Sequence, residues 1–301
     1  MVGMSHHSHS CSHHPAPTSF HKAFGIGITL NSLFVAIEIA AGLYTGSLAL
    51  VADALHNLGD VLGLVLAWIG YYFAHKPPSG RFTFGFGRLS IFATVFNGAL
   101  LVGSAIWIVI EAIERWNAPA VEATGVVMIT AAIGIVINMG TALALMRGQH
   151  DINIKGAFLH MLGDAGVSAA VILAALVIHY TGIGMIDPAL AVLVAIFILW
   201  TSWPLMVEGL RMAIDGVPSH IDHEKITAFL LQQPYISEVN DLRIWATSTT
   251  KTALSAHIVV KDDKPNDEML KELHHLLQHE FGLASVTLQL ESSHVACITT
   301  A

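Results

Sequence analysis

The sequence predicts an α-helical membrane protein: six transmembrane helices followed by a small α+β domain. Three observations lead to this prediction. The 301 residues are 54% hydrophobic and only 12% charged, with a mean hydropathy of +0.63, whereas soluble domains carry about 25% charged residues. Six apolar segments reach the roughly 20 residues that a membrane-spanning helix needs. After Asp215 the apolar segments give way to acids, lysines and amphipathic stretches.

The first 22 residues form a separate segment that is rich in histidine and cysteine. Six of the 18 histidines fall within the first 21 residues, in "MVGMSHHSHSCSHH" and shortly after it. The stretch lacks the basic start and apolar core of a secretory signal. We interpret residues 1–22 as a flexible cytoplasmic tail that binds metal. The alternative is that these residues are the remnant of a purification tag. The interrupted histidine run argues against this alternative, because a tag is normally an unbroken run.

The transmembrane domain is predicted to span residues 23–215, with short connections between its helices. Gly216 and Pro218 end the last helix and mark the boundary to the next domain. The predicted helices cover residues 23–44, 48–73, 89–113, 121–146, 155–180 and 186–206.

Lysine and arginine are distributed unevenly between the two ends of these helices. With the N-terminus inside, the outer side holds only Arg115. The inner side holds seven basic residues, namely Lys22, Lys76, Arg81, Arg88, Arg147, Lys155 and Arg211. This positive-inside bias predicts that both termini are cytoplasmic.

Residues 216–301 are predicted to form a cytoplasmic two-layer α+β domain in the order helix, strand, strand, helix, strand. The expected elements cover residues 222–233, 239–246, 252–260, 266–281 and 284–292. Asp222 is placed to cap the first helix. The second and third strands alternate apolar and polar residues, as strands covered on one face do.

A doubled motif is the most informative feature of the chain. "LHNLGD" ends at Asp60 and "LHMLGD" ends at Asp164, each within a predicted transmembrane helix. On a helix, residues four apart share one face, so His56 projects beside Asp60, and His160 beside Asp164. An acid in the middle of a membrane helix costs roughly 2.5 to 3.5 kcal/mol on insertion scales, and such residues mark functional sites by default.

The two helices run in opposite directions, so side-by-side packing brings His56 near Asp164 and Asp60 near His160. Two imidazoles and two carboxylates suit a tetrahedral Zn²⁺ site, whereas Ca²⁺ and Mg²⁺ require more oxygen ligands. The alternative is two independent His–Asp pairs that hold helices together. Counting from the outer ends places His160 and Asp164 deeper than their partners, so we expect the fifth helix to be tilted, kinked or displaced.

Other polar residues within the membrane segments have simpler expected roles. Asp53 either lines an exit path or makes a local hydrogen bond. We expect Glu38, Asn97 and Asn138 to form hydrogen bonds between helices. The glycines beside the two acids, Gly59 and Gly163, are expected to allow close backbone approach.

The chain resembles the cation diffusion facilitator family, specifically its zinc-type members. The resemblance covers nearly everything after the first 20 residues and rests on six stretches: "TGSLALVADALHNLGD", "LHMLGD", "RFTFGFGRLS", "AIDGVP", "LSAHIVV" and "VTLQLES". It implies a homodimeric metal/proton antiporter in the cell (inner) membrane, with a copper-chaperone-like, ferredoxin-type cytoplasmic domain. His56, Asp60, His160 and Asp164 match the family's transport site.

The resemblance also implies accessory metal ligands. In the cytoplasmic domain, His257 and Glu291 fall at ligand positions, although Asn240 stands where many relatives have a histidine; ordinary strand residues are the alternative. His75 lies where relatives may hold an accessory metal. The "HVAC" ending, His294 to Cys297, is a further candidate that would pair with residues of the N-terminal tail, namely Cys11, His13 or His14.

These observations predict a proton-coupled exporter of divalent cations, with Zn²⁺ as the transported substrate and no organic cofactor. Zinc binding displaces protons from its ligands, so a pH difference can drive transport. The alternatives are a membrane metalloenzyme, which would need an open coordination position, and a metal sensor that transports nothing. The net charge of −8, without a basic patch, excludes nucleic acid as a partner.

Overall fold

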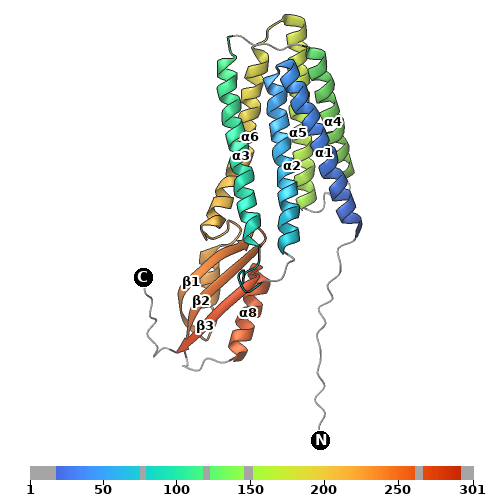
Figure 1. Cartoon of the computed structure of the whole chain (residues 1–301). Helices are drawn as coiled ribbons and strands as arrows, with labels where there is room; N and C mark the ends of the chain where they lie inside the picture. The colour runs from blue at the N-terminus through green and yellow to red at the C-terminus, as the bar shows by residue number, and fades with distance from the viewer. Residues whose placement is uncertain (1–17, 75–78, 118–122, 146–151, 262–266, 293–301) are drawn as a thin grey trace.

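The computed structural model describes residues 18–74, 79–117, 123–145, 152–261 and 267–292. Six long helices form a bundle, and a small α+β domain lies at one end of it (Figure 1). The helices of the bundle are α1 (Thr18–Thr45), α2 (Leu48–Ala74), α3 (Arg88–Glu114), α4 (Thr124–Leu145), α5 (Ile152–Thr181) and α6 (Ile186–Ala213). Each has the length and hydropathy to cross a membrane. The six predicted spans are therefore confirmed.

The main difference from the predicted boundaries is at α6, which continues seven residues beyond the predicted end to Ala213. Pro204 lies within the helix without ending it, because a proline removes a single backbone hydrogen bond that neighbouring packing can offset. The extension is also anchored, since Met212 packs against Ile91 of α3 and Ala246 of the small domain. The helix thus carries the chain directly into that domain.

Small residues allow the bundle to pack closely around α2. Ala49, Ala52, Ala105 and Ala195 are almost fully buried in one apolar cluster. Of the apolar span of α2, 56% is buried, compared with 28–39% of the other five spans. Large apolar side chains such as Trp200 and Val136 are exposed on the outside of the bundle, where lipid would cover them. Helix α2 is therefore the central helix.

At the end far from the small domain, Asp187 of α6 holds the start of α2. Its Oδ2 atom accepts a hydrogen bond from the Leu48 backbone N–H (2.6 Å), and its Oδ1 atom accepts one from the Ser47 hydroxyl (2.5 Å). Arg115 donates to the carbonyl of Gly46 nearby (3.0 Å). The unpaired N–H groups of a helix start need such acceptors when no water reaches them.

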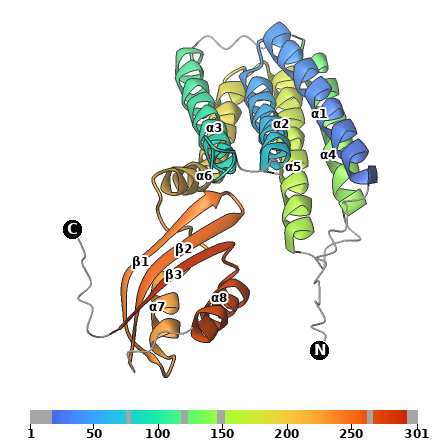
Figure 2. The same cartoon turned by 60° about the horizontal axis from the view of Figure 1, so that its bottom comes forward.

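The small domain has a three-stranded sheet with two helices on one face, as Figure 2 shows. Its elements are α7 (His223–Leu231), β1 (Ile236–Ser248), β2 (Lys251–Val260), α8 (Asp267–Phe281) and β3 (Ser285–Ser292). Strands β1 and β2 form an antiparallel hairpin, and β3 pairs with β2 in parallel after the α8 crossover. This confirms the predicted order and the two layers.

The domain's core is formed where the sheet meets its helices. Leu254, Ala256 and Ile258 of β2 and Leu288 of β3 are buried there, together with Leu273 of α8. The alternate positions lie on the other face of the sheet. At the start of α7, the Asp222 side chain accepts from the Lys225 N–H (3.1 Å), which lowers the pKa of this carboxyl below its usual value.

The bundle and the small domain meet at the start of α3. Arg88 forms an ion pair with Asp215 (2.6 Å), and the Thr249 N–H donates to the Ser90 hydroxyl (3.1 Å). Gly87 lies so close to β1 that an added Cβ would be 2.6 Å from the carbonyl oxygen of Thr247. A pocket of about 500 Å³ opens beside this junction.

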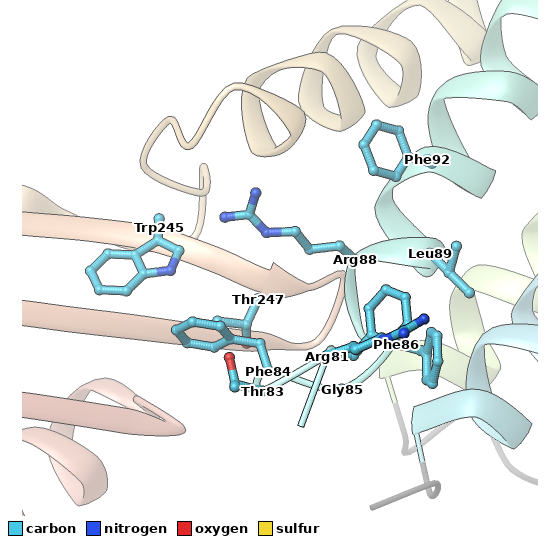
Figure 3. Close-up of a pocket in the computed structure, with 11 residues that line it drawn as sticks. Arg81, Thr83, Phe84, Gly85, Phe86, Arg88, Leu89, Phe92, Trp245 and Thr247 are labelled. Carbon is cyan, nitrogen blue, oxygen red and sulfur yellow. The ribbon is translucent and has the colours of Figure 1, made fainter. Parts of the chain in front are cut away.

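Figure 3 shows the lining of this pocket, with Trp245 and Thr247 from the sheet facing Phe84 and Arg88 from the membrane half. None of the residues of the doubled motif is among its lining residues. The pocket is therefore a feature of the domain junction and not of the candidate metal site.

Candidate metal centre

The two copies of the doubled motif meet between α2 and α5. The His56 Nε2 atom lies 3.3 Å from Oδ1 of Asp164, and the His160 Nε2 atom lies 3.2 Å from Oδ2 of Asp60. This crosswise pairing matches the antiparallel arrangement that the sequence predicts. Each helix contributes one histidine and one acid on the same face, because four residues make about one turn.

The four side chains form one group and not two separate pairs. Within each helix, His56 Nε2 is 3.8 Å from Oδ2 of Asp60, and His160 Nε2 is 3.6 Å from Oδ2 of Asp164. One ligand atom from each residue can be chosen so that all four lie within 4.8 Å of one another. A tetrahedral zinc ion with bonds of roughly 2.0–2.1 Å places its ligand atoms about 3.3 Å apart. The observed spacing is close to that geometry.

Burial of the four side chains is graded along the bundle. The side chains of His56 and Asp164 are 3% and 2% exposed, whereas those of Asp60 and His160 are 33% and 40% exposed. The more exposed pair lies one helical turn closer to the small domain, because α2 descends toward that domain and α5 ascends from it (Figure 1). The group is therefore more exposed at its small-domain end and buried at the opposite end, which we call the sealed side.

A displacement of α5 brings the motifs to one depth. Figure 1 shows α5 shifted along its axis, away from the small domain, relative to α2. Asp164 lies farther from the C-terminal end of α5 than His56 lies from the N-terminal start of α2. The shift of α5 nevertheless brings Asp164 to the level of His56. Of the three alternatives that the sequence left open, displacement is the one observed.

The two motif glycines differ from expectation. A Cβ added to Gly59 would lie 2.2 Å from Leu101 Cδ2. The missing side chain of Gly59 therefore allows close packing of α2 against α3, and not against α5. Gly163 has no heavy atom within 4 Å of an added Cβ. The prediction that both glycines allow close approach of α2 and α5 is therefore wrong. The histidine and aspartate side chains of the doubled motif lie between these two helices and hold their backbones apart.

Other buried polar groups surround the sealed side. Asp53 accepts a hydrogen bond from the Ser168 hydroxyl of α5 (3.0 Å), and Glu38 accepts one from the Asn57 side chain (2.9 Å). Asp53 is 0% exposed, so in this state it makes a hydrogen bond and lines no open path. Glu38 forms the predicted interhelical hydrogen bond.

Among the residues that the structure describes, the predicted hydrogen bonds of Asn97 and Asn138 to other helices are not seen. Asn97 and Asn138 are buried, and the Asn97 Oδ1 and Asn138 Nδ2 atoms have no hydrogen-bond partner. Asn138 lines a small cavity of about 30 Å³ that also reaches Asp60 and Asp164. That volume is on the scale of a single water molecule.

In the small domain, His257 and Glu291 also lie together. The His257 Nδ1 atom is 2.6 Å from Oε1 of Glu291, and the second carboxylate oxygen of Glu291 is buried without a partner. Asn240 stands opposite His257 across the β1–β2 ladder. The described residues of one chain therefore supply two metal-ligating side chains here, too few for a closed zinc site.

The remaining candidate ligands lie outside the described residues. These are Cys11, His13, His14, His75, His294 and Cys297. Sequence reasoning missed Asp187, because its role as the acceptor at the start of α2 depends on a contact between α6 and α2. Its local signal, an acid in the first turn of α6, points only to a role in its own helix.

The four-residue group has the chemistry of a divalent cation site. Two neutral imidazoles and two carboxylates together carry the −2 charge that balances a divalent ion. Both ligand types, imidazole and carboxylate, bind metal in their deprotonated forms. His56 also packs edge-on against Phe197 of α6, with ring centroids 5.8 Å apart, which fixes its orientation.

Comparison with known proteins places both halves of the chain. Residues 26–212 match the family model of the cation efflux transmembrane domain, and residues 218–293 match that of the cation efflux protein cytoplasmic domain. The metal cation efflux system protein CzcD of Cupriavidus metallidurans is 36% identical over 282 residues, which cover 92% of this chain and 89% of that protein.

Two further relatives extend the comparison. The cadmium, cobalt and zinc/H(+)-K(+) antiporter of Bacillus subtilis is 36% identical over 278 residues, covering 90% of this chain and 89% of that protein. The zinc transporter ZitB of Escherichia coli is 32% identical over 289 residues, covering 95% of this chain and 91% of that protein.

Proposed function

Because the chain belongs to the cation efflux (cation diffusion facilitator) family of membrane transporters, we propose that it exports divalent metal cations, foremost Zn²⁺, from the cytoplasm in exchange for protons. His56, Asp60, His160 and Asp164 form the transport site. The site opens alternately to the two sides of the membrane.

The observation that carries this proposal is the convergence of the four side chains. The measured His–Asp pairs are 3.2–3.8 Å apart, and one ligand atom from each of the four residues lies within 4.8 Å of the others, which suits one metal ion. They come from two helices that cross the membrane in opposite directions. A small shift of α5 against α2 would therefore change the site's access while both helices keep their ligands, as in rocking transporters.

Proton coupling follows from the ligand types. Histidine titrates near neutral pH, and a bound metal displaces protons from imidazole and carboxyl groups. A site facing the cytoplasm loads metal with loss of protons, and a site facing a more acidic exterior takes up protons and releases the metal. The related protein of Bacillus subtilis is a cadmium, cobalt and zinc/H(+)-K(+) antiporter, which supports this coupling.

The graded burial supports an inward-open state. The more exposed ligands, Asp60 and His160, lie toward the small domain, which the family model describes as cytoplasmic. The arginines Arg81, Arg88 and Arg211 also lie at this end, and Arg115 lies at the other, in agreement with the positive-inside rule. We therefore place both termini in the cytoplasm and the bundle in the cell membrane.

The selection among metals follows from ligand softness and geometry. A site of two histidines and two carboxylates accepts Zn²⁺, Cd²⁺ and Co²⁺, because affinity order alone does not separate them. The names of the relatives include zinc, cadmium and cobalt. We infer that Zn²⁺ is the principal substrate and that Cd²⁺ and Co²⁺ follow the same route.

The small domain is proposed to dimerise and to sense metal. The family model that matches residues 218–293 is named for a dimer, which supports dimerisation. Within one chain His257 and Glu291 form an incomplete ligand set, so a resident zinc ion here would take its remaining ligands from outside the described residues or from a second copy.

The test is metal flux into vesicles that contain the purified protein. With Zn²⁺ outside and an acidic interior, we expect zinc uptake that stops when a protonophore collapses the pH difference. Asp164→Ala should abolish uptake, and Glu114→Gln, an exposed change at the other end of the bundle, should preserve it. Zinc binding without flux would identify a sensor, and zinc-dependent hydrolysis without flux would identify an enzyme; either result contradicts the proposal.

A further inference from the structure

Two carboxyl groups are buried together on the sealed side of the four-ligand group. Glu38 of α1 and Asp53 of α2 are both 0% exposed. Asp53 lies one helical turn from His56, toward the end far from the small domain. Asn57, which donates to Glu38, lies four residues after Asp53 on the same face of α2, so the two carboxyls are neighbours. Neither belongs to the proposed metal ligands.

Each carboxyl has a donor for one oxygen and none for the other. The Asn57 side chain donates to Oε2 of Glu38 (2.9 Å), and the Ser168 hydroxyl donates to Oδ2 of Asp53 (3.0 Å). The remaining atoms, Glu38 Oε1 and Asp53 Oδ1, are buried without a partner. Two ionised carboxylates hold no proton to share, so in that form both atoms stay unsatisfied.

The groups that act on this pair, besides Asn57 and Ser168, are His56 and the acid Asp164. His56 is neutral when it binds a metal ion. Among the described residues, no lysine or arginine acts on the two carboxyls. Adjacent carboxylates in an apolar interior repel each other strongly and cannot both ionise, and one shared proton removes the conflict.

We propose that Glu38 and Asp53 form a second, proton-binding site that holds one proton between their two carboxyls. The proton completes the hydrogen bonding of both orphaned oxygens. The site is separate from the metal ligands, so it keeps its proton while metal is bound next to it.

The position of the pair connects it to the proposed transport cycle; this step rests on the proposed function. Ser168 lies one turn beyond Asp164 on α5, so the hydrogen bond from Ser168 to Asp53 spans the α2–α5 contact that must change when access alternates. Loss of this bond, together with entry of water from the far side, lets the pair exchange its proton. The pair thereby carries a proton that the four metal ligands do not.

The first experiment detects the proton itself. Zinc-loaded, full-length protein is examined by infrared spectroscopy near neutral pH, where the metal keeps Asp60 and Asp164 ionised. We expect a carbonyl-stretch band of a protonated carboxylic acid. The band should disappear in Glu38→Gln and in Asp53→Asn. It should persist in the control Asp187→Asn, because Asp187 already accepts from Ser47 and Leu48 and needs no proton.

The second experiment measures coupling. In vesicles with a pH-sensitive dye inside, Glu38→Gln should bind zinc with unchanged affinity and move fewer protons for each zinc ion than the wild type. A missing band in the wild type, or a band that survives both substitutions, overturns the shared proton even if zinc/proton exchange is intact. A band that is lost without change in the proton-to-zinc ratio overturns the role in coupling. The wild-type spectrum decides the first point even if a variant fails to assemble.

Discussion

His56 and Asp164 face each other across two antiparallel helices, with Nε2 and Oδ1 3.3 Å apart and both side chains at most 3% exposed. Their residue numbers differ by 108, and each belongs to one copy of the same short motif. The contact joins the two copies into one group.

Asp164→Asn should weaken zinc binding by more than about 100-fold, because loss of a ligand exceeds the 10–100-fold effect of losing an outer hydrogen-bond partner. The change keeps the size of the side chain and removes its charge. Binding of Zn²⁺ to the purified protein, measured by titration calorimetry, provides the test. The exposed variant Glu114→Gln should bind as the wild type does, and equal affinity in both variants would remove Asp164 from the site.

Zinc affinity should fall as the pH is lowered. Metal binds the deprotonated ligands, so each proton that must leave makes the apparent affinity drop by about tenfold per pH unit once the ligands are protonated. The same titration at several pH values measures this slope. A slope of zero between neutral and mildly acidic pH would contradict exchange of metal for protons at these side chains.

Gly59→Ala should destabilise the bundle by about 1–3 kcal/mol, whereas Gly163→Ala should have little effect. At Gly59 the new methyl group would lie 2.2 Å from buried Leu101, and at Gly163 it would meet nothing within 4 Å; overpacking of a filled interior has this cost. Thermal unfolding in detergent compares the two variants. Equal melting temperatures would contradict this prediction and would show that Leu101 of α3 can move aside without cost.

Asp187→Ala should lower the free energy of unfolding by about 2 kcal/mol, because hydrogen bonds to a charged group contribute more than neutral ones. The substitution leaves the Leu48 N–H and the Ser47 hydroxyl without their acceptor at the start of α2. Thermal unfolding measures the loss, with Glu114→Gln as the exposed control. An unchanged melting temperature would indicate that water replaces the carboxylate at this end.

His257→Ala should reduce the number of zinc ions bound per chain and leave the affinity of the transport site unchanged. His257 and Glu291 lie in the small domain, away from α2 and α5. Metal analysis after equilibrium dialysis gives the stoichiometry, and Asp164→Asn removes the other class of site. If His257→Ala binds as many ions as the wild type, the pair is an ordinary hydrogen bond at the sheet surface.

The doubled motif made most of the candidate site predictable from the sequence. Periodicity placed His56 and Asp60 on one face, and the antiparallel course of the helices paired them crosswise with Asp164 and His160. The six spans and the αββαβ order were also predictable, because apolar length and strand alternation are local signals.

The parts that sequence did not reveal depend on long-range contacts. The axial shift of α5 and the packing of Gly59 against Leu101 arise from how whole helices fit together. The hydrogen bond between Asp187 and Ser47 at the start of α2 joins residues that are 140 positions apart in the sequence. The last helix is predicted to end at residue 206, but it continues to Ala213, where Met212 packs against Ile91 and the small domain.

The unequal exposure of the four ligands has a consequence for how an aqueous ion would enter. In the proposed transport, an ion arriving from the small-domain end would meet His160 and Asp60 while water still surrounds its other side. It would then exchange those waters for His56 and Asp164. Dehydration would thus be divided into two smaller steps, so that no single barrier requires the whole hydration shell to be shed at once.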